Sequence, residues 1–196
     1  MKRLVNKRVI LASASPRRRE LLQTIVPDFE LAPNRKIDEV YPHELPASEV
    51  AGYISREKAE AYSDLVDDNT LVITADTVVA CDGEIFGKPH TPEEARQMLR
   101  RLSGRSHFVY TGVTVHGKDK TVSFTDCTEV KFTPLSDEEI ESYVDEMHPF
   151  DKAGAYGIQE WIGYIGVESI TGCYYNVMGL PVQKLYRALK EFTSRR

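Results

Sequence analysis

The sequence predicts an α/β fold, a mixed sheet with flanking helices, and three observations indicate it. Segments rich in β-branched and apolar residues alternate with segments whose apolar residues recur at helical spacing. Short turns join two pairs of the β-rich segments into hairpins, so the sheet is not purely parallel. The 196 residues are 41% hydrophobic, enough to bury the core of one compact domain, and we expect a single domain over residues 1–196.

The first half of the chain is expected to hold four strand segments and two helices. Pro16 suits the first position of a helix and Ser15 suits its N-cap, so a helix closely follows the first strand. The Asp82-Gly83 pair is a tight-turn signal between two strand segments. In order, the elements are a strand at 9–12, helices at 17–25 and 46–65, and strands at 70–74, 77–81 and 84–86.

The second half is expected to hold a long hairpin and three helices. Segments 91–94 and 136–139 have the sequence of a capping box, which predicts that a helix begins at each. Residues 117–120 form the turn of the hairpin. In order, the elements are a helix to about 102, strands at 108–115 and 121–132, a helix to about 147, a strand at 163–170 and a helix at 181–192.

Composition excludes several classes of protein. The formal net charge is −5, so the chain lacks the basic excess that general nucleic-acid binding needs. Cys81, Cys127 and Cys173 form no CxxC pair, which argues against a structural zinc site and a disulfide framework and indicates reduced thiols in the cytoplasm. The apolar run at 9–12 is too short for a signal peptide, and no later segment is long enough to cross a membrane.

Arg17, Arg18 and Arg19 fall in the first turn of the first predicted helix. Cations are unfavourable there by roughly 0.3–1 kcal/mol each, because the helix dipole is positive at that end. An anion explains the placement, and phosphate is the simplest candidate, since backbone N–H and guanidinium groups can bind it together. The alternative is a solvated basic turn on a surface helix.

Asp76 follows the apolar run at 71–75, so we expect it at the end of a strand, with the hydroxyl group of Thr77 beside it. A carboxylate in this position can bind a divalent cation or accept a proton from water as a general base. The alternative is a strand-end aspartate that only satisfies a turn.

Further charged residues are candidates for the same chemistry. Lys88 lies between a glycine and a proline, where an extended backbone can present its ammonium group to phosphate oxygens. An exposed loop lysine is the alternative, and Lys58, in the middle of a predicted helix, would alone be a surface residue. Asp38-Glu39 is a carboxylate pair that could help to bind a metal, although a solvated acidic pair is more common.

The segment at 150–159 alternates small residues and glycines with Tyr156 and Gln159. Its backbone can approach a flat ligand, although Tyr156 could instead simply pack. The amide of Gln159 carries a donor and an acceptor that complement the edge of uracil or thymine; a glutamine in a surface turn is the alternative. Arg105 and His107 could also be ligands, although a histidine near a strand start is more often structural.

Seven motifs resemble, in order and over nearly the whole chain, those of the Maf family of nucleoside triphosphate pyrophosphatases. They are LASASPRR (11–18), REKA (56–59), ADTV (75–78), GKP (87–89), LSGRSH (102–107), DKAGAYGIQ (151–159) and VMGLP (177–181). Each motif alone is modest evidence, whereas the ordered set is specific. Motifs of P-loop, dinucleotide-binding and serine-esterase type are absent from the sequence.

The resemblance implies a fold similar to inosine triphosphate pyrophosphatases, with two lobes around a central cleft, often as a homodimer. It implies hydrolysis of a nucleoside triphosphate to the monophosphate and pyrophosphate with a divalent cation, Mg²⁺ or Mn²⁺. By residue, it implies catalytic roles for Asp76, Lys58 and Lys88, substrate binding by Ser13, Arg17, Arg18, Thr77 and Gln159, and metal binding by Glu39 and Asp76.

The form of the 151–159 motif is similar to that of the family branch that acts on dTTP and UTP. Modified pyrimidine triphosphates are further candidate substrates, whose hydrolysis would serve a house-cleaning role. The chain departs from that branch just after the motif, where Glu160-Trp161-Ile162 replaces a glycine-rich turn. Two alternatives stay open. One is a nucleotide-binding regulator of cell division without significant hydrolysis, and the other is the sister specificity for 7-methylguanosine triphosphate.

Overall fold

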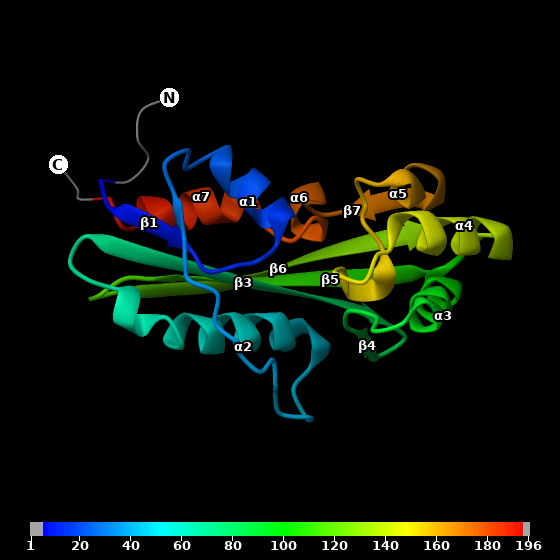
Figure 1. The fold of residues 1–196 in the computed structure, drawn as a ribbon, viewed down its shortest axis with the longest axis horizontal. Helices are drawn as coiled ribbons and strands as arrows, with labels where there is room; N and C mark the ends of the chain where they lie inside the picture. Colours follow the sequence, from blue (N-terminus) through cyan, green and yellow to red (C-terminus); the bar gives the residue numbers. More distant parts are fainter. Residues whose placement is uncertain (1–5, 194–196) are drawn as a thin grey trace.

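A seven-stranded mixed sheet crosses the protein, whose structure is a computed structural model that describes residues 6–193 (Figure 1). The strand order is β2-β1-β3-β5-β6-β7, and β4 pairs with the end of β3. β1 runs parallel to β2 and β3, and the other pairs are antiparallel. The strands are β1 (Arg8–Leu11), β2 (Glu30–Leu31), β3 (Thr70–Cys81), β4 (Glu84–Phe86), β5 (Ser106–His116), β6 (Thr121–Phe132) and β7 (Val167–Thr171).

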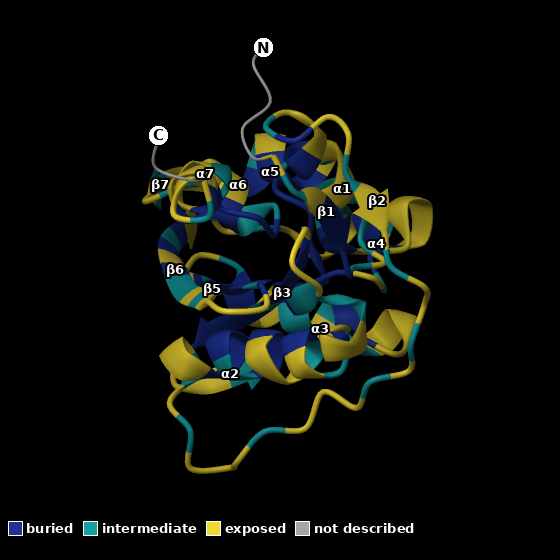
Figure 2. Cartoon of the chain, turned by 90° about the vertical axis from the view of Figure 1, so that its left-hand side faces the viewer, coloured by how far each residue is buried: buried dark blue, intermediate teal, exposed yellow. Residues whose placement is uncertain are grey.

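Helices cover both faces of the sheet, with α1 and α7 on one face and α2 on the other (Figure 1). Figure 2 shows buried residues on the inner faces of these layers and exposed residues outside. Within residues 6–193, no helix combines the length and apolar character needed to cross a membrane. The helices are α1 (Pro16–Gln23), α2 (Ala47–Glu60), α3 (Pro92–Leu102), α4 (Asp137–Met147), α5 (Trp161–Gly166), α6 (Tyr174–Val177) and α7 (Val182–Lys190), with 3-10 turns η1 (Ser63–Leu65) and η2 (Ala153–Ala155).

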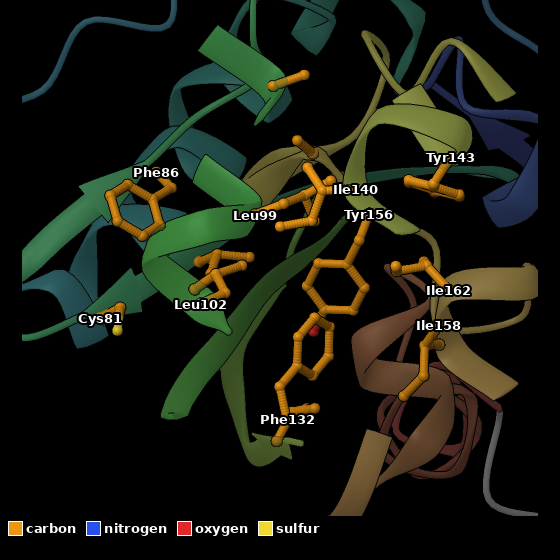
Figure 3. Packing of buried hydrophobic residues seen from close by; sticks show 14 of the residues in the cluster. Cys81, Phe86, Leu99, Leu102, Phe132, Ile140, Tyr143, Tyr156, Ile158 and Ile162 are labelled. Carbon is orange, nitrogen blue, oxygen red and sulfur yellow. The ribbon is translucent and has the colours of Figure 1, made fainter. Parts of the chain in front are cut away.

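The hydrophobic core is divided between two lobes that share β3. Leu71, Ile73 and Ala75 pack with α1, β1 and α7. Val79 and Cys81, further along the strand, pack with α3, α4 and α5 in the cluster shown in Figure 3. The two-lobed mixed α/β fold is therefore confirmed, and the residues between these two sets on β3 lie where the lobes meet.

Helix α2 packs very closely on the sheet. A Cβ atom at Gly112 of β5 would lie 2.3 Å from the backbone of Ala51, so no larger residue fits there without movement of the helix. The close approach brings Lys58, near the end of α2, within hydrogen-bonding distance of β3.

All three helix starts that the sequence predicted from capping are confirmed. The Oγ of Ser15 accepts a hydrogen bond from the N–H of Arg18 at 3.5 Å, with a proline at the start of α1. Ser136 and Glu139 form a complete capping box at α4. At Thr91 the box is incomplete. The side chain of Thr91 accepts a hydrogen bond from the N–H of Glu94, but the carboxylate of Glu94 accepts from the N–H of His90 and not from that of Thr91.

The prediction that Asp76 ends a strand is wrong. The segments 70–74 and 77–81 form one continuous strand, β3, and Asp76 lies in its middle. The polar pair Asp76-Thr77 does not end the strand because side chains from α2 and α1 bond to it from opposite faces. A buried strand can accept such residues where partners satisfy them.

The prediction of a strand at 163–170 is wrong in its first half. The N–H groups of Gly163 and Tyr164 donate to the carbonyl oxygen of Glu160 and begin α5, so only the segment from β7 onward joins the sheet. The helix expected at 46–65 ends earlier, and η1 follows it. The short helix α6 was not expected.

Candidate active site

A cleft of about 1060 Å³ lies across the middle of β3 and is lined by residues of both lobes. Its walls come from the start of α1, the segment 31–41, α2, β3, the loop after β4 and the segment 151–159. All nine residues expected to act on substrate or metal line it: Ser13, Arg17, Arg18, Glu39, Lys58, Asp76, Thr77, Lys88 and Gln159. Asp38 is exposed and does not line the cleft.

Asp76 and Thr77 direct their side chains to opposite faces of the sheet, as successive residues of a strand do. Asp76 bonds to Lys58 of α2, and Thr77 bonds to Arg18 of α1. One strand therefore joins the two layers of helices at the cleft.

Lys58 holds two carboxylates together. Its Nζ donates to Oε1 of Glu39 at 2.6 Å and to Oδ1 of Asp76 at 2.7 Å. The side chains of Lys58 and Asp76 are 13% and 8% exposed, so this pair lies out of bulk solvent, where charge interactions are strong. The prediction that Lys58 alone would be a surface residue is wrong, because α2 packs directly over β3.

Glu39 reaches the cleft from the segment before α2. Partial burial opposes its ionisation, but the hydrogen bond and charge of Lys58, with the charges of Lys88 and Arg18, hold the pKa of Glu39 below its usual value. Lys88 thus contributes positive charge to the same place. Among residues 6–193, Lys88 has no ion-pair partner, so its ammonium group is available to a ligand.

Arg18 is held by four acceptors from three segments. Its guanidinium donates to the carbonyl oxygens of Gly179 and Ala75, each at 2.8 Å, to Oγ of Thr77 at 2.9 Å and to Oγ of Ser13 at 3.3 Å. Burial lowers the pKa of Arg18, and the charge of Asp76 opposes this effect. Arg18 therefore fixes the walls of the cleft to one another, and it directs positive charge into the cleft.

The hydroxyl group of Thr77 is part of this anchoring. Thr111 donates its single proton to the carbonyl oxygen of Asn176 at 2.9 Å, so Thr77 donates to Thr111, also at 2.9 Å, and accepts from Arg18. Its proton is thus already used within the protein. A direct substrate contact by Thr77 stays a prediction.

The three arginines of α1 differ in their surroundings. Arg17 donates to Asp151 at 2.9 Å across the cleft. Burial raises the pKa of Asp151, but the bonds from Lys152 and Arg17 outweigh it and hold that pKa low. Arg19 is exposed and donates only to the carbonyl oxygen of Ala14, at 3.4 Å.

Gln159 presents an unused acceptor in the cleft. Its Oε1 is buried and accepts no hydrogen bond from residues 6–193. A buried polar atom without a partner is costly, and because Gln159 lines the cleft, a ligand bound there can satisfy it. Tyr156, by contrast, packs in the core, where its hydroxyl group bonds to Nε2 of His107 at 2.8 Å.

His107 and Arg105 do not belong to the cleft lining. His107 is fully buried, and burial lowers its pKa to about 4, so it is neutral at physiological pH. Arg105 pairs with Asp82 at the surface. Two further residues near the site were not predicted. No motif marks Tyr143, and the only signal for the buried Lys152 is its place within a motif.

The donor set fits a divalent cation of the Mg²⁺ type. Glu39 and Asp76 converge on a single cationic group, the ammonium of Lys58. Within residues 6–193, no group of three or more His, Cys, Asp and Glu side chains could hold a metal ion. Mg²⁺ commonly binds one or two carboxylates together with substrate phosphates and water, so two carboxylates are a suitable protein contribution.

At the level of the fold, the chain is similar to a solved structure. The Staphylococcus aureus Ham1 protein has a TM-score of 0.56 to this chain, with 18% identity over 94% of this chain and 99% of its own. The protein is therefore a two-lobed α/β protein with a fold like that of the Ham1 protein and a charged cleft.

Sequence comparison narrows this class to one family. The family model for Maf-like protein matches residues 8–192, so the chain belongs to the Maf family. A relative from Bacteroides thetaiotaomicron is 53% identical, over 93% of this chain and 95% of its own. A relative from Parabacteroides distasonis is 52% identical, over 98% and 100%. Both are named dTTP/UTP pyrophosphatase.

Proposed function

We propose that the protein hydrolyses dTTP, UTP and modified pyrimidine triphosphates to the monophosphate and pyrophosphate. The observation that carries the proposal is that Glu39 and Asp76 both bond to the ammonium group of Lys58. The same cleft also holds Lys88, Arg17 and Arg18. The basic side chains suit the oxygens of a polyphosphate, and the two carboxylates suit a metal ion bound with it. The names of relatives that are 52–53% identical support the choice of substrate.

Asp76 acts as the proton acceptor for the attacking water. Its Oδ1 bonds to Lys58, and its Oδ2 accepts no side-chain hydrogen bond from residues 6–193, so one oxygen can orient the water. Lys58, Lys88, Arg17 and Arg18 bind phosphate oxygens and neutralise the charge that grows in the transition state. Mg²⁺ or Mn²⁺ near Glu39 and Asp76 would add Lewis-acid neutralisation of the same oxygens.

The reaction class is tested with a panel of canonical and modified triphosphates, incubated with the protein and Mg²⁺ or Mn²⁺. We expect release of pyrophosphate, fastest from dTTP and UTP, and no release with a chelator present. Release of orthophosphate instead would overturn the reaction class. Tight binding of nucleotides without any hydrolysis would favour the regulatory alternative, and a preference for 7-methylguanosine triphosphate would favour the sister specificity.

Gln159 reads the pyrimidine edge through its free acceptor. Replacing Gln159→Ala removes the pairing, and we expect the ratio of kcat/KM for dTTP over dGTP to fall about tenfold, since a bidentate base contact provides roughly 1–3 kcal/mol of discrimination. An unchanged ratio would count against this role.

Three further expectations stay proposals. The free thiols of Cys81, Cys127 and Cys173 suit a reducing compartment, which supports a cytoplasmic location. A homodimer is proposed from the family alone and is tested by light scattering. Binding of nucleic acid is not expected, because the net charge is −5.

A further inference from the structure

The segment that carries Gln159 belongs to no strand or helix. It lies between η2 and α5, where the N–H of Glu160 donates to the carbonyl oxygen of Gly157 at 3.0 Å and closes a turn over 157–160. Gln159 is the third residue of this turn. Helix hydrogen bonds reach the turn at its last residue, where the carbonyl oxygen of Glu160 accepts from Gly163 and Tyr164 of α5. No sheet hydrogen bond among residues 6–193 holds the turn, so the position of Gln159 also depends on side chains that bind the ends of the turn.

Tyr143 of α4 binds both ends of the turn. Its hydroxyl group accepts a hydrogen bond from the N–H of Gly157 at 3.0 Å and donates its proton to the carboxylate of Glu160. Burial, the hydrogen bond to Glu160 and the charge of Glu160 all raise the pKa of Tyr143, so its phenol stays protonated and remains a donor. Tyr143 is 1% exposed and packs in the hydrophobic cluster of Figure 3. The same cluster contains Ile158, within the turn, and Ile162, two residues after it.

Lys152 provides the second clamp on Glu160. Its Nζ lies 3.0 Å from Oε1 of Glu160 and 2.7 Å from Oδ1 of Asp151, and its side chain is 8% exposed. Asp151 in turn accepts from Arg17. Glu160 therefore ends a row of alternating charges that begins at the arginine of α1.

Glu160 also lies directly against the backbone that it holds. A Cβ atom added to Gly157 would be 2.7 Å from the carboxylate carbon of Glu160. The carboxylate thus fills the space beside the turn, and each of its oxygens has a named donor. A carboxylate that is largely shielded from solvent and has both oxygens hydrogen-bonded is a rigid support.

We propose that Glu160 is a positioning residue for nucleobase recognition. Clamped by Tyr143 and Lys152, it fixes the 157–160 turn so that the amide of Gln159 meets the edge of a pyrimidine. The inference rests on the proposed function, because it takes Gln159 as the residue that contacts the base. It adds a support for specificity that lies outside the phosphate and metal residues.

The test compares Glu160→Ala and Tyr143→Phe with the conservative variant Glu160→Gln and the control Glu168→Gln, which removes the charge of a glutamate exposed on β7 and paired with Lys131. In the first two, the kcat/KM ratio for dTTP over dGTP is expected to fall about tenfold, through a higher KM for dTTP with little change in kcat. Glu160→Gln keeps one acceptor oxygen and should retain at least part of the preference. The control should match the wild type.

A binding experiment that needs no catalysis distinguishes a failure of this inference from a failure of the proposed function. By calorimetry, the affinity for thymidine 5′-monophosphate should fall about tenfold in Glu160→Ala, while that for pyrophosphate changes less than twofold. The melting temperature and the fluorescence of Trp161, the single tryptophan, verify that each variant is folded.

Three results would overturn the inference. They are an unchanged nucleotide preference in folded Glu160→Ala and Tyr143→Phe, an equal loss for pyrophosphate and thymidine 5′-monophosphate, and a wild type that does not discriminate thymidine from deoxyguanosine monophosphate. A wild type that binds thymidine monophosphate selectively but hydrolyses no triphosphate would end the proposed function instead. The affinities of the variants would then still decide the role of Glu160.

Discussion

The two walls of the cleft are built in different ways. On the first, which we call the hydrolysis wall, Asp76 lies in the middle of a central strand and Lys58 on a helix packed directly against it. On the second, the recognition wall, Gln159 lies on a turn outside the sheet, which Tyr143 and the start of α5 hold at its ends. Backbone hydrogen bonds fix the elements that carry the residues proposed to meet the reacting phosphates, whereas a few polar contacts fix the residue proposed to meet the base. A change of base preference is therefore possible without disturbing the hydrolysis wall.

The largest expected effect comes from the hydrolysis wall. Replacing Asp76→Asn removes the proton acceptor but keeps the shape, so kcat should fall by about 10³-fold, or about 4 kcal/mol in the barrier, while nucleotide binding remains. Pyrophosphate release and calorimetric titration measure the two properties. Asp82→Asn, at an exposed turn with a φ of 51° that asparagine accepts, is the matched control and should be fully active. Full activity in Asp76→Asn would remove this residue from the mechanism.

The second largest effect is expected from the close packing of α2 on β5, which places Lys58 at the cleft. Gly112→Ala would put a Cβ atom 2.3 Å from the backbone of Ala51 and push α2 away from the sheet. We expect a loss of about 3 kcal/mol in the free energy of unfolding, measured by urea denaturation. Gly87→Ala, whose Cβ atom would meet nothing within 4 Å, should change stability by less than about 0.5 kcal/mol. Equal stability of the two variants would show that α2 can shift without cost.

The candidate functional residues of both walls were predictable from the sequence, whereas the long-range contacts that position them were not. The start of α1 was foreseen because proline and serine have local conformational preferences at a helix start. The middle position of Asp76 was missed because its partner, Lys58, is 18 residues away in the chain, and no local pattern shows that pairing. The helix α5 was missed because its first hydrogen bonds go to Glu160, which is itself held by a tyrosine of α4.

His107, which bonds to Tyr156 in the core, makes the free energy of unfolding depend on pH. Its pKa is about 4 in the folded protein against 6.5 when exposed, because burial disfavours the charged ring. Between these values the unfolded chain binds the proton and the folded chain does not, so stability falls as the pH drops from about 6.5 to about 4, by up to about 3 kcal/mol. His107→Gln should flatten this part of the profile, measured by urea denaturation at several pH values. The exposed His43→Gln should leave the slope unchanged; a slope retained in His107→Gln would assign it to another group.

The smallest effect separates two neighbouring arginines at the junction of the walls. Arg17 crosses the cleft to Asp151, whereas Arg19 is exposed and bonds only weakly to Ala14, so Arg17→Ala should lower kcat/KM for dTTP about tenfold and Arg19→Ala less than twofold. Arg19→Ala removes a cation from the positive end of α1, and it should therefore raise the free energy of unfolding by roughly 0.3–1 kcal/mol, seen in thermal denaturation without ligand. A loss of activity in Arg19→Ala as large as that in Arg17→Ala would mean that the anion contacts the whole first turn of α1 and would contradict the separation of the two arginines.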